Sequence, residues 1–332
     1  MEMRFIAEGL DFPAGPLALG VGDVAIAEIG AGRLVRIGRH GTRAVLAEVG
    51  GAPAGSAIGP DGAIYLCNNG SPKIVREQLP DGRTAYRPPE PGELPPGIGG
   101  QIQRVTLDGE VSTVHRACEG RDLMAPTGIV FDRQGCFYVS DSGRYDGPVR
   151  NPGVSTESKH LSVLRMAGAM VRQAAGSIYY ASPDGRMIRE VLHPLAAPSG
   201  LALSPDETTL YVAEAGTGRI WAFQVAAPGQ LGKRRCLGVA PGARPLNFSW
   251  CEGIAVDDDA NVLTATVVNG GVTTFSSHGQ LIEHVSTGDP FTTGLCFGGD
   301  DRRTLFVTLG GSGRLIAYEA WPTRGHRPDY GA

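Results

Sequence analysis

Glu252 is the residue of this sequence best suited to acid–base chemistry. It lies in the apolar segment Cys251–Val256, where Trp250 and Cys251 directly precede it. An apolar wall penalises the charged form of a carboxyl group, which raises its pKa toward the range of a useful general acid or base. We therefore expect Glu252 to be catalytic and Trp250 to line the substrate site. The alternative is that Glu252 simply pairs with a nearby arginine.

Asp141 is a second candidate, in the segment Ser140–Gly143 that follows an apolar run. If its side chain lies near Glu252, the two carboxyl groups form a pair whose pKa values are pushed apart, so that one serves as acid and the other as base. Asp141 is therefore predicted to be catalytic. The alternative is an Asx turn before Gly143, because an Asp side chain often binds its own backbone two residues on.

Asn68 and Asn69 follow the apolar run Ile64–Cys67 in the same way. One of the two amides is expected to donate a hydrogen bond to a substrate oxygen. Turn formation explains both residues almost equally well, because Asn is common in turns.

Residues 144–176 form a polar stretch that carries Tyr145, Lys159 and His160. Side chains of these types can cover a site and supply a proton donor or bind an anion. Tyr145 and His160 are therefore predicted to contact the substrate. The alternative is a polar lid that takes no part in the chemistry.

Several common catalytic signatures are missing from the sequence. It contains no Gly-x-Ser-x-Gly, no His-Glu-x-x-His and no Walker-type phosphate-binding loop. These absences argue against the enzyme classes that those motifs identify.

The elements that position these residues belong to a repeat. A small or polar residue is followed by glycine, an apolar strand, a turn rich in Asp and Gly, and a second apolar strand. This pattern occurs six times, with copies that begin at Pro13, Pro53, Pro126, Pro198, Cys251 and Thr292. Several short antiparallel strands in each of six units are typical of a β-propeller. We predict an all-β, six-bladed propeller that forms a single domain over residues 1–332.

Two spacings in the repeat are longer than the others and mark insertions at about 71–100 and 144–176. The second falls in the third blade, and both are expected to be loops or extra hairpins. The strand-like segment Arg4–Ala7 lies outside the first copy. We expect it to complete the sixth blade and so to close the ring, which leaves no sheet edge exposed at the junction.

Composition agrees with a turn-rich fold. The 49 glycines and 24 prolines make up about a fifth of the 332 residues, against about 12% in ordinary proteins. Both residues disfavour helix interiors, so long helices are excluded. The six cysteines are too far apart for a Cys-x-x-Cys motif, and this indicates free thiols in a reducing compartment.

The formal net charge is −4, and no dense cluster of Lys and Arg occurs. Nucleic acids and anionic membranes are therefore not expected as partners. No apolar run approaches the ~18 residues of a membrane span. We expect a cytoplasmic monomer or homodimer that acts on a small molecule.

Several strings carry a resemblance to a known family. They are Ala57–Gly62 with Cys67–Gly70, Leu201–Asp206 with Tyr211–Glu214, Asp289–Thr293 and Cys296–Gly299. With them, nearly all of the chain resembles the SMP-30/gluconolactonase/luciferin-regenerating-enzyme (LRE-like) family of six-bladed propellers. The resemblance implies hydrolysis of a sugar lactone or a related cyclic ester, in a central tunnel.

The resemblance also implies one divalent cation, held by the residues that precede the repeat glycines. The family pattern is Glu in the first blade, Asn in the third and fourth, and Asp in the fifth. This sequence has instead Ala14, Thr127, Ser199 and Glu252, with Ala54 in the second blade. Such a set is a poor cage for calcium, zinc, magnesium, manganese or iron.

We therefore predict a degenerate or absent metal site and no cofactor, with Glu252 as the ligand if a metal is retained. Thr127 and Ser199 are then expected to bind substrate. Two alternatives stay open: a metal-independent lyase, isomerase or condensing enzyme similar to the strictosidine-synthase-like propellers, or a propeller that binds a small molecule without catalysis.

Overall fold

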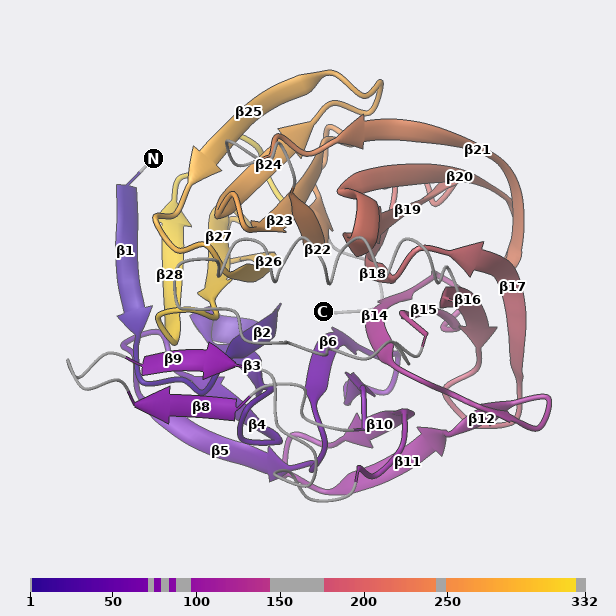
Figure 1. Cartoon of the computed structure of the whole chain (residues 1–332), viewed down its shortest axis with the longest axis horizontal. Helices are drawn as coiled ribbons and strands as arrows, with labels where there is room; N and C mark the ends of the chain where they lie inside the picture. The colour runs from indigo at the N-terminus through magenta and orange to yellow at the C-terminus, as the bar shows by residue number, and fades with distance from the viewer. Residues whose placement is uncertain are drawn as a thin grey trace, which may run out of the picture.

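The structure is a computed structural model that describes residues 2–70, 75–78, 84–87, 97–143, 176–242 and 249–326. Within these residues, six four-stranded antiparallel sheets surround a central axis (Figure 1). The sheets are the blades of a six-bladed β-propeller, which confirms the predicted fold. No described helix has the length and apolar character to cross a membrane.

The first three blades follow one another along the chain. Blade 1 consists of β2 (Pro13–Ala18), β3 (Val24–Glu28), β4 (Arg33–Ile37) and β5 (Arg43–Glu48). Blade 2 consists of β6 (Pro53–Ile58), β7 (Ile64–Asn68), β10 (Gln101–Val105) and β11 (Val111–His115). Blade 3 consists of β14 (Pro126–Phe131), β15 (Phe137–Asp141), β16 (Gly176–Ala181) and β17 (Ile188–Leu195).

The remaining blades complete the ring. Blade 4 consists of β18 (Pro198–Leu203), β19 (Thr209–Glu214), β20 (Arg219–Ala227) and β21 (Gln230–Val239). Blade 5 consists of β22 (Trp250–Val256), β23 (Val262–Val267), β24 (Gly271–Phe275) and β25 (Leu281–Ser286). Blade 6 consists of β26 (Thr292–Gly298), β27 (Thr304–Leu309), β28 (Arg314–Glu319) and β1 (Glu2–Ala7).

Blade 6 joins the two ends of the described chain. β1 runs antiparallel to β28, with Met3 opposite Tyr318 and Phe5 opposite Ile316. The predicted closure of the ring by the N-terminal strand is confirmed, although the pairing already begins at Glu2.

Short elements lie in some of the connections between strands. They are the hairpins β8–β9 (Val75–Gln78 and Thr84–Arg87) and β12–β13 (Ala117–Cys118 and Arg121–Asp122), and the single 3-10 turns η1 (Gly20–Gly22) and η3 (Ala215–Thr217). The hairpin β8–β9 falls within the predicted insertion at 71–100. The predicted insertion in blade 3 lies almost entirely outside the described residues, between β15 and β16.

The core consists of six apolar clusters, one between each pair of neighbouring blades. Each sheet is therefore covered on both faces, and its inner strands are apolar at successive positions rather than at alternate ones. In β3, Val24 and Ile26 pack toward blade 6, whereas Ala25 and Ala27 pack toward blade 2.

Aspartates fix the turns between the first and second strands. In four blades the aspartate side chain accepts a hydrogen bond from the backbone N–H two residues on, at Asp61, Asp132, Asp206 and Asp301. Such Asx turns explain why the repeat carries Asp between its two apolar strands.

A glycine near the start of each innermost strand allows the six strands to approach one another. A Cβ atom at Gly128 would overlap the carbonyl oxygen of Ser199 in the next blade and would lie 3.0 Å from Ser140 Oγ. Equivalent contacts with the following blade occur at Gly15, Gly55, Gly200, Gly253 and Gly294. The repeat glycines are therefore required by close packing around the axis.

Candidate functional site

The residues that precede these six glycines form a closed ring around the axis, which we call the axial ring. Each lies on the innermost strand of its blade, and each innermost strand contacts the next, including β26 with β2. A β-bulge interrupts the pairing with the second strand near each of them. The axial ring consists of Ala14, Ala54, Thr127, Ser199, Glu252 and Thr293.

Glu252 is the only carboxylate of the axial ring. It is half-buried on β22. The preceding Cys251 is fully buried among the apolar residues between blades 4 and 5. Burial raises the pKa of the Cys251 thiol to about 12, with the charge of Glu252 as a further cause. The thiol is therefore neutral near pH 7.

The hydroxyl groups of the axial ring join neighbouring blades. Ser199, which is 2% exposed, donates from its Oγ to the carbonyl oxygen of Cys251 at 2.8 Å. Thr293 Oγ1 contacts the carbonyl oxygen of Pro13 in the same way. The structure thus places Ser199 away from the surface of the ring, and its predicted contact with substrate stays a prediction.

Thr127 takes part in a related contact. Its Oγ1 donates to the carbonyl oxygen of Ala125 at 2.9 Å and lies 2.8 Å from Ser142 Oγ. Ser142 Oγ in turn donates to the carbonyl oxygen of Pro198 in blade 4, at 2.8 Å. Thr127 is half-buried, so that it keeps some exposed surface.

These donors do not fit the divalent cation that the family resemblance implies. Calcium and magnesium prefer several oxygen ligands, with carboxylates among them. Here two positions are alanine, three are neutral hydroxyls with contacts to backbone carbonyls, and one is a carboxylate. The described residues also contain no group of three or more His, Cys, Asp or Glu side chains able to hold a metal.

Asp141 anchors a loop. It ends β15 and is 2% exposed. Its Oδ1 accepts hydrogen bonds from the backbone N–H groups of Ala125 at 2.8 Å and Gly143 at 2.9 Å, and its Oδ2 accepts one from Met124 at 2.7 Å. The contact with Gly143 is the Asx turn that was the alternative to catalysis. The geometry supports that alternative rather than a catalytic pair with Glu252.

Asn68 has the same position at the end of β7 and is fully buried. Its Oδ1 accepts from the backbone N–H groups of Ala52 and Gly70, and its Nδ2 donates to Gly50 O and Gln103 Oε1, at 2.8 to 3.0 Å. Both its donor and its acceptor groups are in use within the protein. Of the two predicted asparagines, the structure therefore favours Asn69 for contact with a ligand.

A polar residue ends the second strand of four blades and binds the loop that leads into the first strand. In blades 1 and 4 the anchors accept backbone hydrogen bonds from Asp11 and Ala196. The sequence carries a signal for this role that was missed, because a polar residue ends the second apolar run in each of these four blades. The four anchors are Glu28, Asn68, Asp141 and Glu214.

Asn69 and Trp250 each carry a buried polar atom without a hydrogen-bond partner. These atoms are Asn69 Oδ1 and Trp250 Nε1, and both side chains are half-buried overall. Asn69 follows β7 in blade 2 and Trp250 begins β22 in blade 5. These two blades face each other across the axis, as β6 and β22 show in Figure 1. Tyr145 and His160, the remaining predicted contacts, lie outside the described residues.

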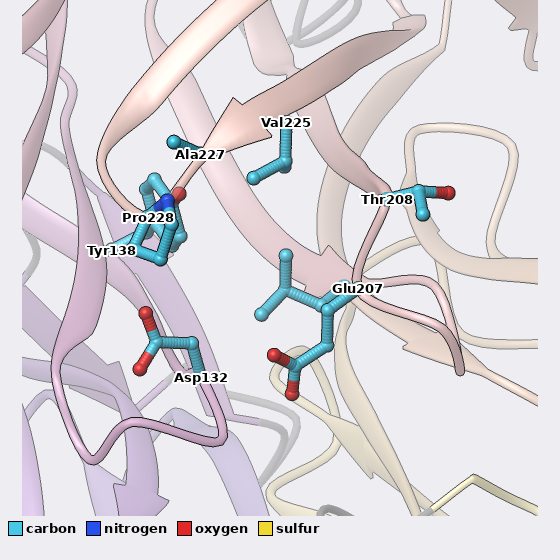
Figure 2. Close-up of a pocket in the computed structure, with 8 residues that line it drawn as sticks. Asp132, Tyr138, Glu207, Thr208, Val225, Ala227 and Pro228 are labelled. Atoms are coloured by element: carbon cyan, nitrogen blue, oxygen red, sulfur yellow. The ribbon is translucent and has the colours of Figure 1, made fainter.

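A separate cavity of about 170 Å³ lies between blades 3 and 4 (Figure 2). Asp132 and Glu207 line it from the turns that follow β14 and β18. These turns are at the opposite ends of the innermost strands from the axial ring. Asp132 Oδ1 accepts from the backbone N–H groups of Gln134 and Cys136, and Asp132 Oδ2 accepts from Tyr180 at 2.6 Å. Burial and the bond to Asp132 raise the pKa of Tyr180, which remains a neutral donor.

The model of the SMP-30/gluconolactonase/LRE-like region matches residues 22–311, which is most of the chain. The chain belongs to this family. Lactonase drp35 from Staphylococcus haemolyticus is 30% identical over 162 residues, which are 47% of this chain and 40% of the relative. The gluconolactonase of Zymomonas mobilis is 24% identical over 264 residues, which are 76% of this chain and 60% of the relative.

The matched region thus spans less than two thirds of the length of either curated relative of the family. A solved gluconolactonase structure from Xanthomonas campestris has a TM-score of 0.70 and 21% identity, and the superposition covers 98% of this chain and 89% of that one. This structural similarity supports the fold alone. The sequence identity is too low to assign the substrate of that protein to this chain.

Proposed function

We propose that the chain hydrolyses a small lactone-like cyclic ester at the axial ring, with Glu252 as general acid and base. The observation that carries this proposal is the position of Glu252, the one carboxylate of the axial ring, on the innermost strand of blade 5. The names of the relatives, a lactonase and a gluconolactonase, support the same class of substrate.

We infer further that this hydrolysis needs no divalent cation. Alanine stands at two positions of the axial ring, and the hydroxyls of Ser199 and Thr293 already bind backbone carbonyls of the next blade. A single carboxylate provides neither the charge nor the number of ligands that a hard cation needs. Glu252 would instead accept a proton from the attacking water, the work of a general base.

The polar atoms across the ring support a hydroxylated substrate. Trp250 Nε1 is a donor on blade 5, and Asn69 Oδ1 is an acceptor on blade 2. A sugar lactone offers the complementary groups, because it has a carbonyl oxygen that accepts and hydroxyl groups that donate. An apolar ester would leave Asn69 without a partner.

A hydrolysis assay in ¹⁸O-water tests the proposal. D-glucono-1,5-lactone, D-galactono-1,4-lactone and γ-butyrolactone are compared in a pH-stat, with the uncatalysed rate subtracted, in the presence and absence of EDTA. We expect turnover of the hydroxylated lactones, one ¹⁸O atom in the product acid, and no effect of EDTA. Glu252→Gln should lower kcat by about 10²- to 10⁴-fold, whereas Glu110→Gln, at an exposed turn, should retain full activity.

Other results would redirect the assignment. Loss of activity in EDTA with recovery on addition of a divalent cation would overturn the metal-free mechanism. A product of unchanged mass without ¹⁸O would identify a lyase or isomerase. Full activity of Glu252→Gln would remove Glu252 from the mechanism.

A further inference from the structure

Two indole nitrogens are buried without an acceptor in the described part of the chain, at Trp250 and Trp221. An N–H group removed from water loses free energy unless it finds a partner, so that nearly all buried donors in native proteins are paired. An orphan donor beside a candidate catalytic group is therefore a sign of a ligand that completes its hydrogen bonding. The other unpartnered buried atoms are Asn69 Oδ1 and Thr274 Oγ1.

Trp250 lies two residues before Glu252 on β22. The residue between them, Cys251, points into the core between blades 4 and 5, where its thiol donates to the carbonyl oxygen of Gly218. Trp250 precedes this core residue and Glu252 follows it, at the β-bulge between Cys251 and Ile254, so that both belong to one short segment at the axial end of blade 5.

Hydrolysis of an ester needs a donor for the negative charge that develops on the carbonyl oxygen, and such stabilisation is a large part of catalysis. In a site without a cation, the protein itself must supply that donor. The hydroxyls of Ser199, Thr293 and Thr127 contact backbone carbonyl oxygens. The indole N–H of Trp250 has no acceptor within the protein and is close in sequence to the carboxylate.

We propose that the Trp250 indole N–H binds the carbonyl oxygen of the cyclic ester and stabilises the oxyanion during hydrolysis. This inference rests on the proposed function, to which it adds the electrophilic partner of Glu252. It also specifies the substrate: the reacting carbon must carry an oxygen that can accept a hydrogen bond.

The step balances with water as the only co-reactant. The oxygen of water forms a bond to the carbonyl carbon while Glu252 takes one of its protons, and the π electrons of the carbonyl move to the oxygen held by Trp250. When the oxyanion collapses, the carbonyl bond reforms and the ring C–O bond breaks. The leaving oxygen takes the proton back from Glu252, which yields the hydroxy acid and restores the carboxylate.

Trp221 offers a matched control. Its Nε1 is equally buried and unpartnered, but it lies on β20, the third strand of blade 4, where the Arg234 guanidinium stacks on its ring at 4.9 Å. Loss of this indole N–H should not alter the reaction. The pair of variants Trp250→Phe and Trp221→Phe therefore separates a role in catalysis from the general effect of a buried tryptophan.

Kinetics form the first part of the experiment. With the lactone hydrolysed fastest by the wild-type enzyme, Trp250→Phe should lower kcat about 10²- to 10³-fold with a much smaller change in KM, whereas Trp221→Phe should keep wild-type values. Equal activity of the two variants would overturn the inference and leave the proposed function intact. Circular dichroism of both variants checks that they are folded.

Nuclear magnetic resonance forms the second part and does not depend on turnover. The ¹⁵N-labelled Glu252→Gln protein is titrated with D-galactono-1,4-lactone, and its indole N–H signals are assigned from the two Trp→Phe variants. A shift of the Trp250 signal, with the Trp221 signal unchanged, supports a hydrogen bond to the lactone even if the wild-type protein hydrolyses nothing. In that case the proposed function is wrong, whereas the inference about the Trp250 N–H stands. An unmoved Trp250 signal at saturating lactone overturns the inference.

Discussion

The axial ring and the cavity between blades 3 and 4 both contain carboxylates, but they use them differently. In the cavity, Asp132 is 4% exposed and binds two backbone N–H groups and the hydroxyl of Tyr180. In the axial ring, Glu252 is half-buried and lies two residues from an indole N–H without an acceptor. The buried aspartate of the cavity is thus satisfied within the protein, whereas the indole N–H next to the axial ring is not. We therefore choose the candidate site by its unpartnered buried donor, which needs an explanation, and not by its number of charges.

Removing one carboxylate from each region tests whether the two carboxylates have different roles. Asp132→Ala leaves three donors unpaired and should destabilise the fold by about 3–5 kcal/mol, while the folded protein keeps its kcat. Glu252→Ala should remove activity, and because Glu252 is half-buried, it should destabilise the fold less than Asp132→Ala does. Urea unfolding and lactone hydrolysis on the same preparations measure both quantities. Loss of kcat in folded Asp132→Ala would show that the cavity takes part in the reaction.

Substitutions of Asp141 test the same rule near the axial ring. The rule is that a buried carboxylate bound to backbone N–H groups has a structural role. Asp141→Ala should cost about 2–3 kcal/mol, because it strands the N–H groups of Met124, Ala125 and Gly143. Asp141→Asn keeps one acceptor oxygen and should lose less stability, with kcat within a factor of two of wild type. A 100-fold lower kcat in Asp141→Asn would restore the catalytic pair with Glu252.

Disturbing the close packing of the innermost strands should have a smaller effect on stability. Gly128→Ala should lower stability by about 1–3 kcal/mol, because the added methyl group meets the backbone of Ser199 in the next blade. Gly20→Ala is the control, since a Cβ there meets nothing within 4 Å. Thermal unfolding of the two variants compares them. An equal melting temperature would indicate that the blades can separate at this point without cost.

We expect the loss of stability in acid to come from a residue outside both the axial ring and the cavity. His115 is buried with its Nε2 at 2.9 Å from the carbonyl oxygen of Ser182, and burial lowers its pKa below the ordinary 6.5. The unfolded chain therefore binds a proton more readily, and stability falls as the pH drops below about 6.5. The slope is at most about 1.4 kcal/mol per pH unit for one group.

Removal of this imidazole tests the assignment. His115→Gln should flatten the dependence of the free energy of unfolding between pH 7 and pH 5, with the hydrolysis profile unchanged. If the slope stays as in the wild type, another buried histidine is responsible. His284 is the next to examine, because burial lowers its pKa as well.

Much of the architecture could be predicted because each blade repeats a local pattern. The Asp-rich turns, the apolar strands and the axial glycines recur at fixed places, and the extra strand at Arg4–Ala7 had only one open edge to pair with. The roles of polar side chains were harder to predict. Asp141 and Asn68 look like site residues in the sequence, yet their direction depends on where the backbone N–H groups of a preceding loop point.

Two features of the candidate site had no signal in the sequence. The burial of Ser199 follows from the close approach of blades 4 and 5, which depends on the curvature of the whole ring. Whether Trp250 Nε1 has an acceptor depends on how all the residues around it pack. The assignment of Glu252 as acid and base remains a prediction, motivated by its position in the axial ring.

The shared sheet of β1 and β28 has a consequence for biosynthesis. Among the described strands, β1 is synthesised first and its hydrogen-bonding partner β28 is synthesised last. Contacts between such distant segments slow folding, because a long loop must close before they form. Blades 1 to 5 can each form during synthesis, but β1 must wait unpaired until blade 6 is made. During that interval the unpaired edges of β1 are open to wrong pairing with other strands.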